Sequence, residues 1–297
     1  MPSSWIENQK SSHLVQLATY ISVGIAGILI IIKFGAWVAT SSISLQATLF
    51  DSILDVAASL INLFAVREAL RPADKEHRFG HGKIEALAAL GQSAFIAGSA
   101  AFLSFEALRR FYEPETLHHT HIGIGVMVIS IILTLGLVLF QRYVVRITRS
   151  TAIKADATHY KADLMVNVGV ILALITAEWF HWYLIDTLLG FAIAGYIVYT
   201  AWEIASEAFH ILIDRELPNE QRTHIRELAL SHPQVKGIHD LRTRSAGLQS
   251  FVQLHLEMDG ALSLSAAHLV ADEVTQLITN VYPEAEVIIH QDIYHSE

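Results

Sequence analysis

Long apolar runs fill roughly the first two thirds of the chain. A helix of about 20 residues is needed to span the hydrocarbon core of a bilayer. The runs that reach this length are roughly Leu14–Ala39, Ser44–Ala69, Ile84–Phe111, Ile122–Tyr143, Ala157–Phe180 and Trp182–Ile211. Residues 1–211 are therefore predicted to form a transmembrane domain of six helices.

From residue 212 onward the apolar segments are shorter and are interrupted by Pro and Gly. In one of them Val252, Leu254, Leu256 and Met258 alternate with polar residues, which is typical of a strand with one buried face. The predicted elements are helix Asn219–Ser231, strand Val235–Arg244, a turn at Ala246–Gly247, strand Ser250–Met258, helix Ser265–Val281 and strand Glu286–Asp292. Ser263 or Ser265 can cap the second helix. The order helix, strand, strand, helix, strand (αββαβ) predicts an α+β ferredoxin-like domain over residues 212–297.

Composition supports a membrane protein and excludes several classes of function. The chain of 297 residues is 53% hydrophobic and 16% charged, with a mean hydropathy of +0.41, whereas soluble domains carry about 25% charged residues. It has no cysteine, so disulfides and thiolate metal sites are excluded, and its 16 histidines are unusually many. The net charge of -9 argues against nucleic acid as a partner.

The distribution of Lys and Arg predicts the orientation in the lipid bilayer. Basic residues are concentrated in two loops, after the second and fourth apolar runs, at Arg67, Arg71, Lys75, Arg78, Lys83, Arg142, Arg146, Arg149 and Lys154. Cytoplasmic loops carry such an excess. We therefore expect the N- and C-termini, and the acidic C-terminal domain, to lie in the cytoplasm.

Two pairs of polar residues inside apolar runs indicate a cation site. Asp51 and Asp55 share one helix face at i, i+4 spacing, and so do His159 and Asp163. An Asp at the centre of a membrane helix costs roughly 2.5–3.5 kcal/mol, so a cation, a proton or an opposing basic residue must offset the charge. Three carboxylates and one imidazole suit a tetrahedral Zn²⁺, although Mn²⁺ and Fe²⁺ accept the same ligands. The alternative is that each pair is a helix-end or interhelical hydrogen-bond site. Lys161 could pair with one carboxylate but cannot neutralise three.

These pairs, together with the loop Arg78–Lys83 and a His-bearing α+β tail, resemble the cation diffusion facilitators. The resemblance covers nearly the whole chain. It implies that Asp51, Asp55, His159 and Asp163 form the transport site of a homodimer in a bacterial inner membrane. It also implies export of the metal in exchange for protons through alternating access. The His at the third position is similar to the zinc and cadmium branch of the family.

Three further groups of residues are candidate sites. The loop after the second span can hold a second ion through Asp74, His77 and His81. The resemblance identifies this group as the family's loop metal site, and a solvated charged loop is the alternative.

In the tail, the resemblance implies a two-zinc cluster at the dimer contact, formed by His239, His255, His268, His290 and Asp292. Lys83 and Asp214 resemble the family's charge interlock between spans and tail, although two unrelated charges fit the sequence equally. His118, His119 and His121 are interpreted as an exposed outer loop.

The function predicted from these features is efflux of cytosolic Zn²⁺, with Cd²⁺ or Fe²⁺ as other possible substrates. Metal binding displaces protons because the ligands must be deprotonated, and external protons compete for His159, whose ordinary pKa is near 6.5. Zinc in the tail would be a structural ion and a sensor of cytosolic metal. Three alternatives remain: a His-bound di-iron membrane enzyme, a membrane-anchored metal sensor or scaffold without transport, and a transporter of organic cations.

Overall fold

The computed structural model describes residues 3–40, 43–112, 121–180 and 184–295. The chain divides into two compact units. The helical unit contains Leu14–Arg71 and Ile84–Phe209, and the C-terminal unit contains His210–Glu297 together with the N-terminal segment up to His13 and the loop Pro72–Lys83. The boundary predicted between residues 211 and 212 stays a prediction.

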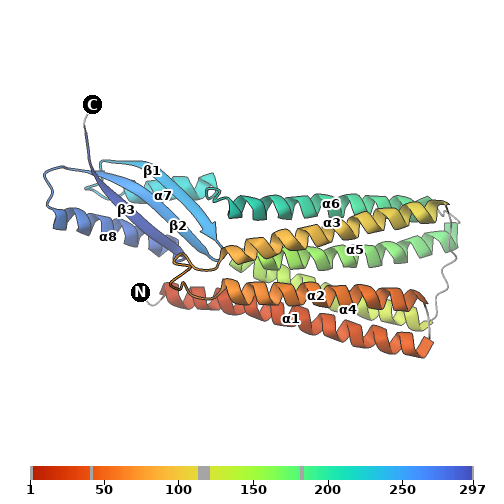
Figure 1. The fold of residues 1–297 in the computed structure, drawn as a ribbon. Coiled ribbons are helices and arrows are strands. Elements are labelled where there is room, and N and C mark those ends of the chain that lie inside the picture. Colours follow the sequence, from red (N-terminus) through yellow and green to blue (C-terminus); the bar gives the residue numbers. More distant parts are fainter. Residues whose placement is uncertain (1–2, 41–42, 113–120, 181–183, 296–297) are drawn as a thin grey trace. The chain divides into compact units, whose positions relative to one another are not determined.

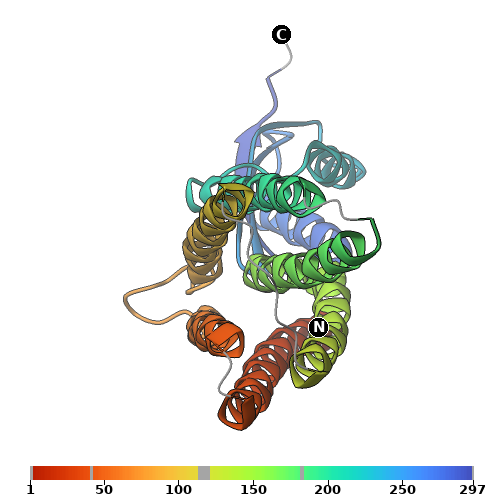
Figure 2. The same ribbon diagram turned by 90° about the vertical axis from the view of Figure 1, so that its right-hand side faces the viewer.

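The helical unit is built from long helices that run alongside one another (Figures 1 and 2). They are α1 (Ser3–Thr40), α2 (Ile43–Ala69), α3 (Lys83–Tyr112), α4 (His121–Thr148), α5 (Thr151–Phe180) and α6 (Leu184–Leu212). Among the described residues, three stretches are long and apolar enough to cross a membrane, namely Ser11–Ala39, Lys83–Phe105 and Gly125–Thr148. Six membrane spans remain a prediction. α5 packs along α4 and also approaches α2.

The fifth helix begins six residues earlier than its apolar run predicted. α4 ends at Thr148 and α5 begins at Thr151. The turn is closed by side chains, because Ser150 Oγ accepts a hydrogen bond from the backbone N–H of Ile153 at 3.3 Å, as an N-cap residue does. The polar first turns of α5 hid this start from the hydropathy pattern, although most of their side chains are buried.

The basic loop predicted before α5 is correspondingly shorter. Arg142 and Arg146 lie within α4, and Lys154 lies within α5. Lys154 Nζ pairs with Glu203 at 3.3 Å and also with Glu207, both on α6. These basic side chains therefore lie within helices rather than in a long connection, and the orientation in the membrane stays a prediction.

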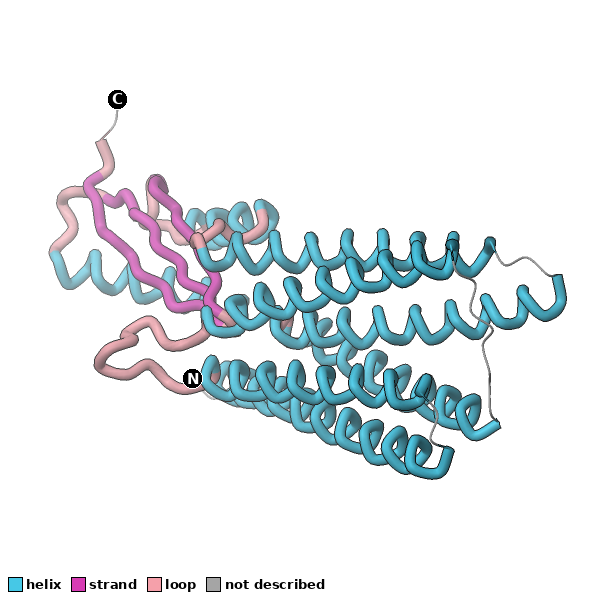
Figure 3. Tube along the Cα trace, turned by 45° about the vertical axis from the view of Figure 1, so that its right-hand side comes forward, coloured by secondary structure: helices cyan, strands magenta, loops and turns pink. Residues whose placement is uncertain are grey.

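The C-terminal unit has the predicted order of elements: α7 (Asn219–Leu230), β1 (Gly237–Ala246), β2 (Gln249–Met258), α8 (Leu264–Val281) and β3 (Ala285–Ile293). Figure 3 shows its three strands, which form one sheet in the order β1-β2-β3. β1 pairs antiparallel with β2, and β2 pairs parallel with β3. The two-residue turn follows Ala246 and contains Gly247 at φ +62, a conformation that favours glycine.

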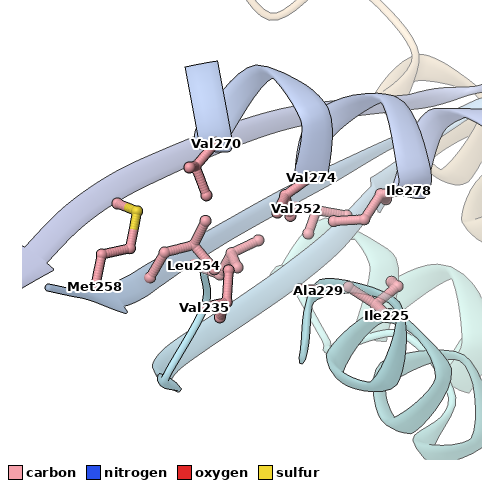
Figure 4. Packing of buried hydrophobic residues seen from close by; sticks show 10 residues of the cluster. Ile225, Ala229, Val235, Val252, Leu254, Met258, Val270, Val274 and Ile278 are labelled. Carbon is pink, nitrogen blue, oxygen red and sulfur yellow. The ribbon is translucent and has the colours of Figure 1, made fainter. Parts of the chain in front are cut away.

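Both helices of this unit pack on one face of the sheet (Figure 4). The inward residues of β2 are those predicted from the alternation, and Val252, Leu254, Leu256 and Met258 are each at most 2% exposed. They meet Ile225 and Ala229 of α7 and Val270, Val274 and Ile278 of α8. Ser263 caps α8 by accepting from the N–H of Ala266 at 3.3 Å. The opposite face of the sheet is thereby left to the polar residues of the strands.

Candidate metal sites

Helices α2 and α5 bring three of the four predicted intramembrane ligands together. His159 Nε2 lies 3.1 Å from Asp55 Oδ1 and 3.5 Å from Asp163 Oδ2. One ligand atom from each of the three residues lies within 4.8 Å of the other two. His159 is 7% exposed, and Asp163 Oδ2 is buried without a hydrogen-bond partner in the described structure. Two carboxylates and an imidazole therefore converge on a space that a divalent cation can fill.

Asp51, the fourth predicted ligand, lies outside this group. It is on α2 one turn before Asp55, and it is exposed. A separation of four residues moves a side chain by about 6 Å along the helix axis, so two Asp residues can share a face without meeting at one point. The role of Asp51 as the fourth ligand therefore stays a prediction.

The early start of α5 places His159 inside the helix rather than at its end. His159 lies about two turns after the first residue of α5. A span starting at Ala157 would instead put His159 at its very end. The helix that carries His159 and Asp163 is longer than its apolar run, so the pair faces the middle of α2.

Asp156 is a buried carboxylate that the sequence pattern did not single out. It is 0% exposed and lies one turn before His159. Its Oδ2 accepts hydrogen bonds at 2.6 Å from Ser22 of α1 and at 2.6 Å from Gln141 of α4. Its Oδ1 accepts from Gln92 of α3 at 3.1 Å. Asp156 thus joins the helix that carries His159 to three other helices.

A second polar contact fixes α2 against α5 beside the site. Ser59 Oγ and the hydroxyl of Tyr160 lie 2.7 Å apart, and both side chains are at most 1% exposed. Ser59 is one turn after Asp55, and Tyr160 follows His159 directly. This contact holds the two ligand-bearing helices in the register that brings Asp55 to His159. The contacts of Asp156 and Ser59 could have been indicated by one sequence signal, namely an Asp or Ser one helical turn away from a candidate ligand.

One basic residue from α1 also reaches this region. Lys33 Nζ donates hydrogen bonds to Ser52 Oγ at 2.7 Å and to the backbone oxygen of Thr48 at 3.2 Å. The sequence offered Lys161 as a partner for a carboxylate, but Lys161 donates to the hydroxyl of Tyr196 instead. Among the described residues, Lys33, which lies within the first apolar run, is a basic residue that contacts α2 next to Asp51.

The loop between α2 and α3 gathers the second predicted group. His77 Nδ1 lies 3.3 Å from Asp74 Oδ1, and His81 Nε2 lies 3.4 Å from Asp74 Oδ2. Hydrogen bonds from the backbone N–H groups of His77 and Glu76 hold the pKa of Asp74 below its usual range. The Nδ1 atom of His81 is buried without a hydrogen-bond partner in the part of the chain described here. All three residues can ligate one ion.

The same loop is anchored within the C-terminal unit. A Cβ added to Gly82 would lie 2.1 Å from the backbone oxygen of Ala246, so only glycine permits this approach. The guanidinium of Arg244 lies 4.8 Å from the ring centres of both Phe79 and Phe251, a cation–π arrangement. The loop that carries the candidate ligands is thus packed against β1 and β2.

The third predicted group lies on the polar face of the C-terminal sheet. Strand pairing aligns His239 with His255 and His255 with His290 across the three strands. Asp292 Oδ2 lies 2.7 Å from His255 Nδ1 and 3.2 Å from His239 Nε2. The hydrogen bond from His255 holds the pKa of Asp292 below its usual range. His239, His255 and Asp292 therefore form a compact group of possible ligands.

The two remaining histidines of this set lie at different distances from the group. His290 Nε2 is 3.4 Å from Asp292 Oδ1, and its ring centre is 4.5 Å from that of His255. His268 is on α8, is exposed, and lies 3.6 Å from Asp272 rather than beside the sheet histidines. Within one described chain, His268 is therefore not brought to the group.

Lys83 and Asp214 form the predicted charge pair, with Nζ and Oδ1 3.0 Å apart. Arg244 Nη1 also lies 3.4 Å from Asp214. Although partial burial favours the neutral acid, the hydrogen bond and charge of Lys83, followed by those of Arg244, hold the pKa of Asp214 below its usual range. Both partners belong to the C-terminal unit.

Of the outer-loop histidines, His118 and His119 lie outside the described residues, and His121 is the first residue of α4.

Comparison with known proteins gives matches along nearly the whole chain. A family model described as the cation efflux transmembrane domain matches residues 19–213, and one described as the cation efflux protein cytoplasmic domain matches residues 217–294. The "Cation-efflux pump FieF" of Serratia proteamaculans is 49% identical over 95% of this chain and 93% of its own length. The protein of the same name from Salmonella choleraesuis is 47% identical over 96% and 95%.

A solved structure of CzrB in its zinc form is similar over a smaller part. It covers 27% of this chain and 92% of the CzrB chain, with 30% identity and a TM-score of 0.26.

Proposed function

This chain belongs to the cation efflux family, the cation diffusion facilitators, and from that premise we propose that it exports Zn²⁺ from the cytoplasm in exchange for protons. Membership makes it a membrane protein and a transporter of metal cations rather than an enzyme. The identity of the cation, the coupling to protons and the alternating access are the proposal.

The observation that carries the choice of zinc is the group Asp55, His159 and Asp163. Its donors are one nitrogen and carboxylate oxygens, with no sulfur, in a space bounded by two helices. Zn²⁺ accepts four such ligands in a tetrahedral arrangement. Asp51, one turn away on α2, is the protein residue that can supply the fourth ligand after a change of rotamer or a small movement of the helix.

Coupling to protons follows from the same ligands. His159 and the carboxylates bind the ion only when they are deprotonated. Each binding event therefore releases protons, and each proton that returns to a ligand weakens the binding of the metal. If the group faces the cytoplasm and the exterior in turn, a higher external proton concentration favours release outside. Asp163 Oδ2, which is buried and has no hydrogen-bond partner in the described structure, is suited to hold either a proton or the ion.

The environment of the protein follows from the charge distribution. We place the six predicted spans in a bacterial inner membrane, with both termini and the C-terminal unit in the cytoplasm. The cytoplasmic domain of this family and the aligned histidines of the sheet support a homodimer held together through that domain. Zinc would be a resident ion there, because two imidazoles and a carboxylate within 4.8 Å fit its preferred donors. Bound zinc would neutralise acidic residues that otherwise repel each other across a dimer contact.

The experiment is a flux assay with the purified full-length protein in liposomes, for Zn²⁺, Cd²⁺, Fe²⁺ and Mn²⁺, with and without a pH gradient. The variant Asp163→Ala should reduce zinc flux to the level of empty liposomes. Asp259→Ala removes a carboxylate that is exposed and paired with Lys236, and it should transport as the unaltered protein does.

Two results would overturn the proposal. Undiminished zinc flux in Asp163→Ala would remove the assigned site from the transport path. Flux that does not respond to the pH gradient would remove the exchange for protons. Competition of an organic cation with Zn²⁺ would instead support the alternative in which these acids select charge alone.

A further inference from the structure

The charges around the candidate transport site are not balanced by its own residues. Asp51, Asp55 and Asp163 are three carboxylates, and His159 is the basic group among the four predicted ligands. Burying several like charges is unfavourable unless a cation accompanies them. When no metal is bound, protons or a basic side chain must offset these charges.

Lys33 of α1 supplies a positive charge at this place. Its ammonium donates to the hydroxyl of Ser52, which is 1% exposed and lies between the two acids of α2 in sequence. Its second acceptor is the backbone oxygen of Thr48, on the same helix. Ser52 directly follows Asp51, and Asp55 lies one turn further along α2. One ammonium is therefore held by two hydrogen bonds next to Asp51, on the helix that also carries Asp55.

A fixed ammonium lowers the affinity for a divalent substrate in two ways. In the empty site it stabilises the carboxylates, and in the loaded site it repels an ion of twice its charge. The attraction of the acids for the metal is reduced by both effects. A transport site needs this property, because binding must be strong enough for entry and weak enough for release.

We propose that Lys33 is a tethered counter-cation of the transport site, which competes with the divalent substrate for Asp51, Asp55 and Asp163 and so lowers the affinity for it. This inference rests on the proposed transport function. It assigns to Lys33 a role in the balance between binding and release, and not a role as a ligand. The competing role is that of a clamp, in which Lys33 only joins α1 to α2 through Ser52 and Thr48.

The two roles predict opposite changes in affinity. Removing a clamp loosens the site and weakens metal binding, whereas removing a counter-cation strengthens it. Lys33→Met keeps most of the side-chain length and removes the charge. We expect the zinc concentration for half-maximal flux to fall about tenfold at constant pH, which corresponds to about 1.4 kcal/mol. The maximal rate should fall as well, because tighter binding slows release.

Three further variants control for other effects, all made in the full-length protein. Lys33→Arg retains the charge and should stay within about twofold of the unaltered protein. Ser52→Ala removes a hydrogen bond of Lys33 but keeps its charge, and it should also stay within about twofold. Lys161→Met removes an ammonium that donates to Tyr196 instead of an acid, so it should leave the affinity for zinc unchanged.

An unchanged or higher half-maximal concentration in Lys33→Met would overturn the proposal, and so would a fall of the same size in Lys161→Met. If Ser52→Ala alone reproduces the effect of Lys33→Met, the hydrogen bond rather than the charge is responsible. Should Lys33→Met fail to fold, Lys33→Gln provides the same comparison.

The proposed function and the role of Lys33 can fail separately. If the unaltered protein carries no zinc flux, the proposed function fails. The role of Lys33 is then tested on equilibrium zinc binding, using the component that Asp163→Ala abolishes. That component should become tighter in Lys33→Met, and no change in it would refute the role of Lys33.

Discussion

Asp156 offers a quantitative test of how the candidate transport site is held in place. Its carboxylate is 0% exposed and accepts hydrogen bonds from Ser22, Gln92 and Gln141, which belong to three helices. The change Asp156→Ala removes both acceptor oxygens at once. Three donors then remain in a space from which water is largely excluded, because Ser22, Gln92 and Gln141 are at most 8% exposed.

The magnitude follows from these three contacts. A buried donor that loses its partner costs about 1–3 kcal/mol, so three donors give a loss of about 3 kcal/mol or more. For a chain of this size 1 kcal/mol corresponds to roughly 2–4 °C in the unfolding midpoint. The midpoint of Asp156→Ala should therefore fall by about 6 °C or more.

The matched control is Asp156→Asn, which has nearly the same shape. One oxygen of the amide still accepts, and its NH₂ group can donate to Oε1 of Gln141, a buried atom that has no hydrogen-bond partner in the described structure. A rotation of the Gln141 amide by half a turn makes this possible. We expect Asp156→Asn to lose less than half of what Asp156→Ala loses.

The assay is thermal unfolding of the purified full-length protein in detergent, followed by the loss of monodisperse protein in size-exclusion chromatography. Zinc flux of both variants should be measured at a temperature well below both midpoints. Equal midpoints for Asp156→Ala and the unaltered protein would refute the reasoning, since three buried donors would then lose their acceptor without penalty.

Three more changes test other parts of the structure. Leu254→Ala should destabilise the C-terminal unit by about 2–5 kcal/mol, because Leu254 is 1% exposed in its core. The control Leu264→Ala changes a residue that is 81% exposed, so it should change the unfolding midpoint little. Asp214 has a lower pKa in the folded than in the unfolded chain, so its pair with Lys83 stabilises the folded state fully above about pH 4, and this stabilisation is lost as the pH falls further. Asp214→Asn should weaken this acid dependence in an unfolding titration followed by fluorescence, and an identical acid profile would contradict it. Gly82→Ala should raise the rate of tryptic cleavage in the loop between α2 and α3, because the added Cβ would lie 2.1 Å from a backbone oxygen of the β1–β2 turn; an unchanged rate would count against that packing.

The sequence alone determined the class of the protein and most of its elements. Apolar runs identified the helical part because a membrane helix has to be apolar over a fixed length. Alternation in β2 identified the buried face because neighbouring residues of a strand point to opposite sides, and Val252 and Leu254 are indeed buried. The family resemblance is confirmed by the matches to its two domains. These features depend on local pattern, which a single sequence contains.

The ends of helices and the contacts between helices were harder to predict from local sequence patterns. The start of α5 at Thr151 depends on the cap by Ser150 and on tertiary burial of polar residues, neither of which raises hydropathy. Asp156 was missed for the same reason, because a satisfied buried carboxylate looks like a polar boundary in a hydropathy profile. Its role is visible only when its donors from three other helices are in view.

For the candidate transport site, too, the sequence predicts one part of the arrangement and the tertiary structure decides the other. Spacing in the sequence fixes which side chains share a helix face, so Asp51 with Asp55 and His159 with Asp163 could be paired from the sequence. The distance between helices is set by packing, and only the tertiary structure placed His159 3.1 Å from Asp55 while leaving Asp51 outside the group. Lys33, from a third helix, was brought to Ser52, the residue next to Asp51. Local periodicity carries no information on such contacts, because they join residues far apart in the chain.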